Sequence, residues 1–104
     1  MSELGARIRY LREQRDWTQA DLSSKAGVSQ SMLSHIETGR RKGNDDDIKE
    51  IAAAFNVSMG LLRDPEISLE KLEQVSYILH EVQYLDEPQV EVIRQLISTL
   101  KASR

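Results

Sequence analysis

Three observations predict that this chain is all-α. Apolar residues recur at intervals of three and four along most of the chain. A residue that favours a helix N-cap precedes each of these runs, and no segment shows the alternation of a strand. The runs predict five short helices over residues 1–64 and a helical hairpin over residues 65–104. We place the boundary at Asp64-Pro65, because proline disfavours a helical conformation in the residue before it.

The composition indicates a small globular protein. The chain has 104 residues, of which 39% are hydrophobic and 30% are charged, enough for one domain and an appendage. The absence of cysteine excludes a disulfide framework and a thiolate metal site. No apolar run approaches the roughly 18 residues of a membrane span, and MSELGARIRY lacks the apolar centre of a signal peptide. We therefore expect a cytoplasmic protein with no membrane partner.

The first two helices are predicted from their caps and apolar spacing. Ser2 is expected to cap a helix whose apolar residues recur at i, i+4 and i+7, namely Leu4, Ile8 and Leu11. Thr18 opens the second helix, with Asp21 in the first turn, where a carboxylate is favourable. Gly27 ends it, because glycine tolerates a positive φ.

Three further helices follow before the boundary. Ser29 caps a third helix that ends near Gly39. Asn44 or Asp45 caps a fourth, and Ser58 caps a short fifth. The fourth helix places four apolar residues on one face: Ile48, Ile51, Ala52 and Phe55.

The last forty residues predict two longer helices. Ser68 caps the first, whose apolar spacing is 3-3-4-3: Leu69, Leu72, Val75, Leu79 and Val82. Asp86 and Gln89 form a capping box with a proline inside the first turn of the second. Its seam contains Val90, Ile93, Ile97 and Leu100. These two helices predict an αα-hairpin with coiled-coil-like seams.

The third helix is unusually polar. Leu33 and Ile36 are its two well-spaced apolar anchors, and most of its other side chains are short and form hydrogen bonds. A helix, a turn with glycine and a second helix form the layout of helix-turn-helix DNA readers. The segment TQADLSSKAGVSQSMLSHIETG closely resembles the Cro/C1-type (XRE) family of prokaryotic and phage repressors. The resemblance covers about residues 4–63 and implies a lambda-repressor-like DNA-binding domain.

Gln30 is the strongest candidate for reading a base, because glutamine pairs bidentately with adenine in the major groove. The resemblance adds Ser31, Ser34 and His35, and it suggests that Met32 contacts a thymine methyl group.

Candidates for phosphate contacts lie at the edges of the helix-turn-helix. They are Gln19, Ser29, Thr38, Arg40, Arg41 and Lys42. By the family pattern Gln19 also braces Gln30.

The resemblance further implies a structural ion pair between Arg12 and Glu37. It places Ser23 where relatives usually have alanine, so we expect its hydroxyl to bond the carbonyl one turn earlier. The acidic run 45–47 is interpreted as capping and first-turn residues of the fourth helix. Three cations of the first helix are interpreted as a solvated face: Arg7, Arg9 and Arg15.

The hairpin is expected to self-associate, because an isolated pair of helices leaves two apolar seams uncovered. The predicted surface comprises Leu72, Val75, Leu79, Val82, Val90, Ile93, Ile97 and Leu100. Tyr77 and Tyr84 are expected at its edges. The alternative is that the hairpin folds back on its own domain.

These observations predict a dimeric regulator that reads a near-palindromic double-stranded DNA site through residues 29–38. The resemblance to the family implies that it is most simply a repressor, with activation left open. A regulatory protein could compete for the hairpin. Two alternatives stay open: an antitoxin or phage immunity regulator whose tail holds a partner protein, and an interaction module that binds no DNA. The net charge of −3 is unfavourable for a DNA-binding protein, so the interaction module stays an alternative. No grouping of residues indicates an enzyme, a cofactor or a metal site, and His35 and His80 lack the spacing of zinc ligands.

Overall fold

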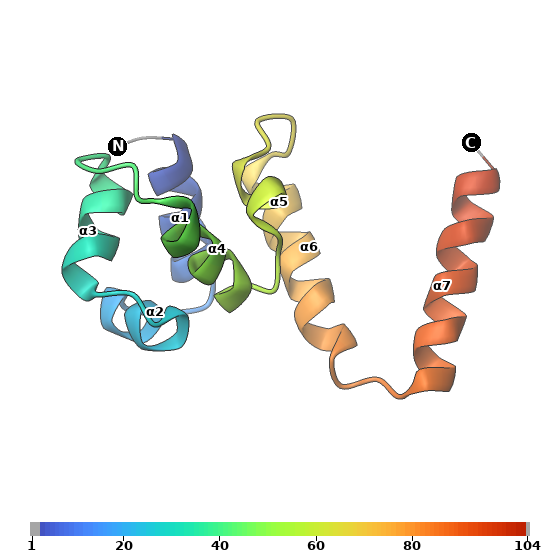
Figure 1. Ribbon diagram of the computed structural model, residues 1–104. Coiled ribbons are helices and arrows are strands. Elements are labelled where there is room, and N and C mark those ends of the chain that lie inside the picture. Colours follow the sequence, from blue (N-terminus) through green and yellow to red (C-terminus); the bar gives the residue numbers. More distant parts are fainter. Residues whose placement is uncertain (1–2, 104) are drawn as a thin grey trace.

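The computed structural model describes residues 3–103 and confirms the all-α class (Figure 1). Seven helices and no strand occur in this range. Their bounds are α1 Glu3–Gln14, α2 Gln19–Ala26, α3 Gln30–Thr38, α4 Asp45–Ala54, α5 Met59–Arg63, α6 Leu69–Val82 and α7 Glu87–Ala102. The order matches the prediction of five helices followed by a two-helix tail. The predicted cap Ser2 lies outside the described residues.

Side-chain caps start six of the helices as the sequence predicts. Each cap oxygen accepts the backbone N–H three residues on, and the capping residues are Thr18, Ser29, Asn44, Ser58, Ser68 and Asp86. The capping boxes of α2 and α7 are both complete. For α4 the structure decides between two candidates, since Asn44 Oδ1 lies 2.8 Å from the N–H nitrogen of Asp47. These contacts satisfy N–H groups that the helix itself leaves without partners.

The core lies between α1, α2, α3, α4 and α5. Its fully buried side chains include Ile8, Leu11, Leu22, Leu33, Ile36, Ile48, Ile51, Phe55 and Leu62. α1 packs on α3, and α2 packs on both α3 and α4. Gly27 has φ 71°, which turns the chain between α2 and α3. The core therefore holds α3 by its two predicted apolar anchors.

The core continues past Pro65 into α6. Leu72 and Ser76 are both fully buried, and α6 packs on α1. Leu72 was expected on the self-association surface, and that expectation is wrong, because the side chain is enclosed by its own chain. The first half of α6 thus folds back on the N-terminal helices, as the alternative interpretation held.

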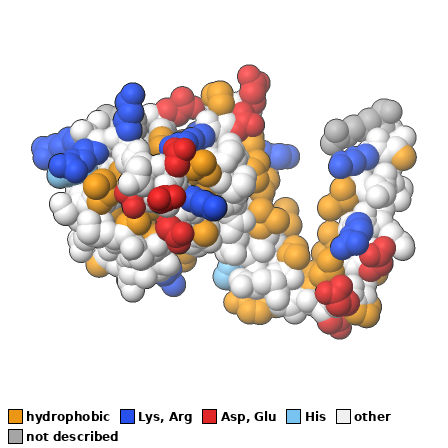
Figure 2. Space-filling view, in the orientation of Figure 1, with side chains coloured by type: hydrophobic (Ala, Val, Ile, Leu, Met, Phe, Trp, Pro, Cys, Tyr) orange, Lys and Arg blue, Asp and Glu red, His pale blue; other side chains and the backbone are white. Residues whose placement is uncertain are grey.

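The second tail helix behaves differently. α7 runs opposite to α6 but diverges from it, so the hairpin is open (Figure 1). No residue of α7 is buried, and its apolar residues Val92, Leu96, Ile97 and Leu100 are between 47% and 67% exposed. Hydrophobic side chains occupy the sides of α6 and α7 that face each other (Figure 2).

Two predicted surface positions are corrected by the structure. Arg7 is only 5% exposed, and its Nη2 donates to the carbonyl of Ile67. Arg15 is paired with Glu73 of α6. Arg9 alone of the three cations lies on an exposed face, where it pairs with Glu13.

A third correction concerns Ser23. Its hydroxyl donates to the carbonyl of Val28, in the turn that follows α2, and not to the carbonyl one turn earlier. The bond ties α2 to the turn that leads into α3. The described helices include none that is long and apolar enough to cross a membrane.

Candidate nucleic-acid interface

α3 presents a polar face above an apolar seat. Leu33 and Ile36 are 0% and 1% exposed and fix the helix against the core. On the outward side Gln30 and Ser31 are exposed, while Ser34 and His35 are half-buried. An exposed polar face at the N-terminal end of a seated helix is what a major-groove reader requires.

Met32 occupies a different environment from the other candidates. Its side chain is half-buried and packs against the hydrophobic core. Packing against the core secures the first turn of α3, and it leaves only part of the side chain available to a thymine methyl group.

The Arg12–Glu37 ion pair is present. Arg12 Nε and Nη2 each lie 2.9 Å from a different carboxylate oxygen of Glu37, in a bidentate pair. Arg12 Nη1 also donates to the carbonyl of Trp17 at 2.9 Å. The hydrogen bond to Glu37 raises the pKa of Arg12 against the opposing effect of burial. The pair joins α1 to the last turn of α3.

Gln19 belongs to the same cluster. Its Nε2 lies 3.3 Å from Oε1 of Glu37, whereas the family resemblance implied a contact with Gln30. Glu37 therefore gathers three donor groups, from α1 and from the start of α2. Gln19 is half-buried, and its amide nitrogen is already engaged by Glu37.

The two hydroxyl candidates for phosphate contact differ in whether the hydroxyl hydrogen is free to donate. Ser29 Oγ accepts the N–H of Met32, so its own hydrogen stays available to an outside acceptor. Thr38 Oγ1 lies 2.9 Å from the carbonyl oxygen of Ser34 and donates to its own helix. Ser29 is thus the better placed donor to a phosphate.

A basic loop follows α3. Arg40, Arg41 and Lys42 are all exposed, and the chain enters the loop through Gly39, whose φ is 81°. The N–H of Arg41 donates to the carbonyl of His35 at 3.2 Å, which folds the loop back on α3. Lys and Arg side chains gather at this end of the molecule, at the left of Figure 2.

The fold adds one cation that the sequence interpretation missed. Arg63 of α5 lines a hollow of about 330 Å³ together with Arg41 and Lys42. Its Nη1 lies 3.2 Å from a carboxylate oxygen of Asp45 at the start of α4. No local pattern marks Arg63, because it reaches the basic loop only through the packing of α5.

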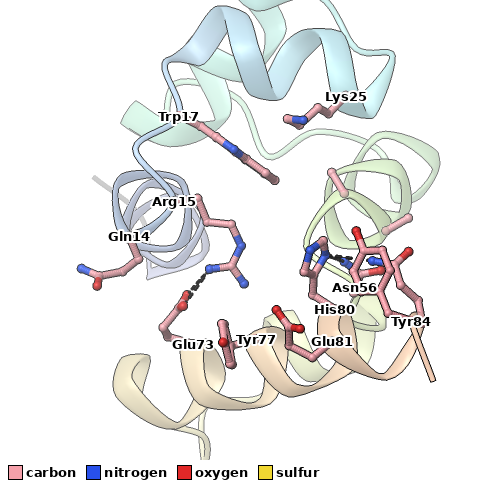
Figure 3. A pocket seen from close by; sticks show the side chains of 13 residues that line it. Gln14, Arg15, Trp17, Lys25, Asn56, Glu73, Tyr77, His80, Glu81 and Tyr84 are labelled. Carbon is pink, nitrogen blue, oxygen red and sulfur yellow. Dashed lines mark hydrogen bonds and ion pairs between the residues drawn. The ribbon is translucent and has the colours of Figure 1, made fainter.

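A groove on another side of the molecule contains the two tail tyrosines. Tyr77 and Tyr84 were expected at the edges of the self-association surface, but they line a groove of about 690 Å³ with Trp17 (Figure 3). Trp17 stacks on Phe55 with ring centroids 5.4 Å apart, and Lys25 Nζ lies 4.8 Å from the Trp17 ring centroid. The aliphatic residues of α6 lie on a different flank of that helix.

The comparison with known families agrees with this geometry. A helix-turn-helix family model matches residues 8–62, more than half of the chain. The chain belongs to the Cro/C1-type (XRE) helix-turn-helix family. The matched range runs from Ile8 in α1 to Leu62 in α5 and contains α2 and α3 whole.

Relatives of this helix-turn-helix family member are bacterial and phage regulators. An HTH-type transcriptional regulator of Mycobacterium tuberculosis is 36% identical over 74 residues, which are 65% of this chain and 29% of that protein. The immunity repressor protein of Bacillus phage phi105 is 32% identical over 71% of this chain and 51% of its own length. The competence pilus inhibition repressor of Acinetobacter baylyi is 32% identical over 55% and 52%. The chain thus spans about half or less of the length of these relatives.

A solved structure extends the likeness to the tail. The SinR protein/SinI protein complex contains a chain that matches with a TM-score of 0.57 and 22% identity. The match covers 95% of this chain and 98% of that chain. At this identity the likeness concerns the fold, including the two helices after α5.

Proposed function

We propose that this helix-turn-helix protein is a sequence-specific DNA-binding transcriptional regulator, and most simply a repressor. The observation that carries the proposal is the exposed polar face of α3, seated on buried Leu33 and Ile36 and followed by an exposed basic loop. Two relatives of this chain, the immunity repressor and the competence pilus inhibition repressor, are repressors, which supports repression over activation.

The roles of the side chains follow from their chemistry and exposure. Gln30 pairs with an adenine edge, and Ser31, Ser34 and His35 contact neighbouring bases. The phosphate contacts come from Gln19, Ser29, Thr38, Arg40, Arg41 and Lys42, with Arg63 added by the fold. These contacts set the register of α3 in the groove but do not read sequence.

We further propose that the protein acts as a homodimer through its tail. α7 buries no residue within its own chain, and an isolated helix of this length is only marginally stable in water. A second copy covers the apolar side chains of both tail helices: Val75, Leu79, Val82, Val90, Ile93, Ile97 and Leu100. The two reading helices would then enter successive major grooves about 34–36 Å apart, on a near-palindromic site.

A partner protein is the second candidate for the same surface. The similar solved structure is a complex of two proteins, SinR and SinI, which supports a tail that accepts a different chain. A partner helix that covers the apolar face of α7 would compete with the second copy and release DNA. In an antitoxin or phage immunity regulator, by contrast, the N-terminal domain would repress its own operon while the tail holds a partner protein.

Selection from a randomised duplex library tests the DNA proposal. At low salt the full chain should enrich a two-fold-symmetric motif. Gln30→Ala should lower affinity for that motif roughly 5- to 150-fold for each half-site, the equivalent of about 1–3 kcal/mol per bidentate base contact, and the dimer loses one such contact in each half-site. Gln74→Ala is the matched control, because Gln74 is exposed on α6, away from α3.

Salt dependence provides an independent check. The logarithm of the binding constant should fall with the logarithm of salt concentration by about 0.9 per phosphate contacted, and Arg41→Ala should reduce that slope by about 1 per protomer, or about 2 for the dimer. A library that enriches no sequence at low salt would overturn the proposal in favour of an interaction module without DNA.

A further inference from the structure

A chain of polar contacts clamps α6 to the DNA-binding helices. Arg15 Nη1 lies 2.7 and 2.8 Å from the two carboxylate oxygens of Glu73 (Figure 3). Arg15 Nη2 donates to the hydroxyl of Ser76, which in turn donates to the carbonyl of Phe55 at 2.7 Å. The clamp, defined as Arg15, Glu73 and Ser76, thus connects the residue just after α1, the residue just after α4 and the middle of α6.

The clamp is shielded from water. The side chains of Arg15 and Glu73 are 16% and 21% exposed, and Ser76 is fully buried. Leu72, one turn before Ser76, is also fully buried. Charged contacts away from solvent are stronger and less screened by salt than exposed pairs, so this clamp holds α6 more firmly than a surface ion pair would.

A second tie holds the start of α6. Only residues 64–68 separate α5 from α6, and Ile67 in this segment packs against the core. The carbonyl of Ile67 accepts a hydrogen bond from Arg7 of α1, which is almost fully buried. The tail is therefore not attached by a flexible linker.

The apolar flank of α6 lies beside the side that packs on the DNA-binding helices, since Leu79 is two turns after buried Leu72. Val75, Leu79 and Val82 lie three and four residues apart, on a different side of the helix from Glu73 and Tyr77. One helix thus has a flank fixed to the DNA-binding helices and a flank proposed to meet the second copy.

We infer that the clamp makes α6 a rigid extension of the DNA-binding domain, so that it determines the separation of the two reading helices in the dimer. The inference rests on the proposed function. Each base pair adds about 3.4 Å and about 34–36° between half-sites, so a shift of two base pairs displaces one half-site by about 7 Å and 70°. A dimer with clamped α6 cannot place both reading helices on half-sites that are displaced in this way, whereas a dimer with loosened α6 can.

Spin-label distances test the rigidity without DNA. The chain has no cysteine, so cysteines introduced at exposed Ser24 of α2 and Gln74 of α6 take up labels specifically. Labelled protein is diluted with unlabelled protein, so that distances within one chain dominate. We expect one narrow distance distribution, a broader one in Glu73→Ala, and a narrowed one in the charge-swapped Arg15→Glu/Glu73→Arg protein.

Glu70→Ala is the matched control for this measurement. Glu70 is an exposed glutamate one turn earlier on α6, and its replacement should leave the distribution narrow. A distribution in Glu73→Ala as narrow as in the unaltered protein would overturn the inference.

Half-site spacing tests the consequence for DNA. The selected half-sites are rebuilt at the original spacing and with one or two base pairs added or removed. The unaltered protein should lose at least tenfold in affinity at a shift of two base pairs, and Glu73→Ala less than threefold, with the same dimer mass. Equal spacing profiles for the two proteins would overturn the inference. A protein that enriches no duplex at all would instead overturn the proposed function, and the label distances would still report on the clamp.

Discussion

Glu37 is the buried carboxylate that binds side chains from both α1 and α2 to the end of α3. It is 2% exposed and accepts hydrogen bonds from two nitrogens of Arg12 and from Gln19. A buried carboxylate is stable only when its charge is compensated, so these donors are structural requirements. If a substitution at Arg12 abolished DNA binding, the loss would therefore be explained by a destabilised fold and would not show that Arg12 contacts DNA.

Arg12→Ala should strongly destabilise the free protein. The change leaves the buried carboxylate of Glu37 without its bidentate partner, and we expect the free energy of unfolding to fall by about 3 kcal/mol. Urea unfolding followed by the fluorescence of Trp17, the single tryptophan, measures it. Arg9→Ala is the control on the same helix, because the Arg9–Glu13 pair is 52% exposed on both sides and should contribute less than about 0.5 kcal/mol.

Asp21 makes the stability of α2 depend on pH. Its carboxylate accepts the N–H of Thr18, and this bond lowers the pKa of Asp21 from its ordinary value of 3.8. A lowered pKa contributes stability above the ordinary value and loses it as the pH falls through the value in the folded state. Asp21→Asn should therefore be less stable than the unaltered protein at neutral pH, and the difference should close in acid. Unfolding measured from pH 7 downwards checks this, and equal stability of both proteins at pH 7 would contradict it.

At the scale of the elements, the close crossing of α1 and α3 depends on one small residue. A Cβ atom added at Gly5 would lie 2.3 Å from the carbonyl oxygen of Glu37 and 2.6 Å from that of Ile36. Both contacts are with backbone, which cannot move aside as a side chain does. The glycine therefore sets how near α1 approaches the end of the reading helix.

Gly5→Ala should push α1 away from α3 and destabilise the protein by about 1–3 kcal/mol, the usual range for overpacking. Gly60→Ala is the matched control, because an added Cβ there meets only Ser58 Oγ, at 3.8 Å. Alanine at the exposed position 60 of the short helix α5 should be neutral or stabilising by up to about 1 kcal/mol. Thermal unfolding of the two variants makes the comparison, and similar effects of both would contradict the close crossing.

At the scale of the whole molecule, the tail leaves apolar surface uncovered. The exposed residues Ile78, Leu79, Leu96, Ile97 and Leu100 come from both tail helices, and hydrophobic side chains face each other across the open hairpin (Figure 2). Exposed apolar surface shared by two elements is typical of an interface. The apolar face of α7 is therefore the surface on which the proposed self-association depends.

Ile97→Asp should convert the proposed dimer to monomers, because it places a charge in the centre of the uncovered seam. Operator affinity should fall at least tenfold, while unfolding of the N-terminal helices should not change, since Ile97 is 47% exposed and contacts no core. Light scattering measures the mass and a titration with operator DNA measures the affinity. Ser98→Asp adds the same charge to an exposed neighbouring position of α7 and should leave the mass unchanged. An unaltered mass in Ile97→Asp would contradict self-association through this seam.

The amino-acid sequence by itself determined the seven helices, five of the six observed side-chain caps, the buried anchors of α3 and the helix-turn-helix family. These features depend on local chemistry: an N-cap side chain bonds N–H groups three residues away, and apolar spacing marks which face is buried. The Arg12–Glu37 pair followed from resemblance to the family, and the structure supplies its bidentate geometry.

Only the tertiary structure decided which surfaces meet. In the folded chain Leu72 is buried in the core, and Tyr77 and Tyr84 line the groove with Trp17. Arg15 pairs with Glu73, which is 58 residues away in the chain. The periodicity of α6 shows that one flank is apolar but not which neighbour covers it, because a seam that packs on its own domain has the same spacing as one that packs on a second chain. Contacts between residues far apart in the chain depend on how the helices are arranged in space, and no local pattern encodes that arrangement.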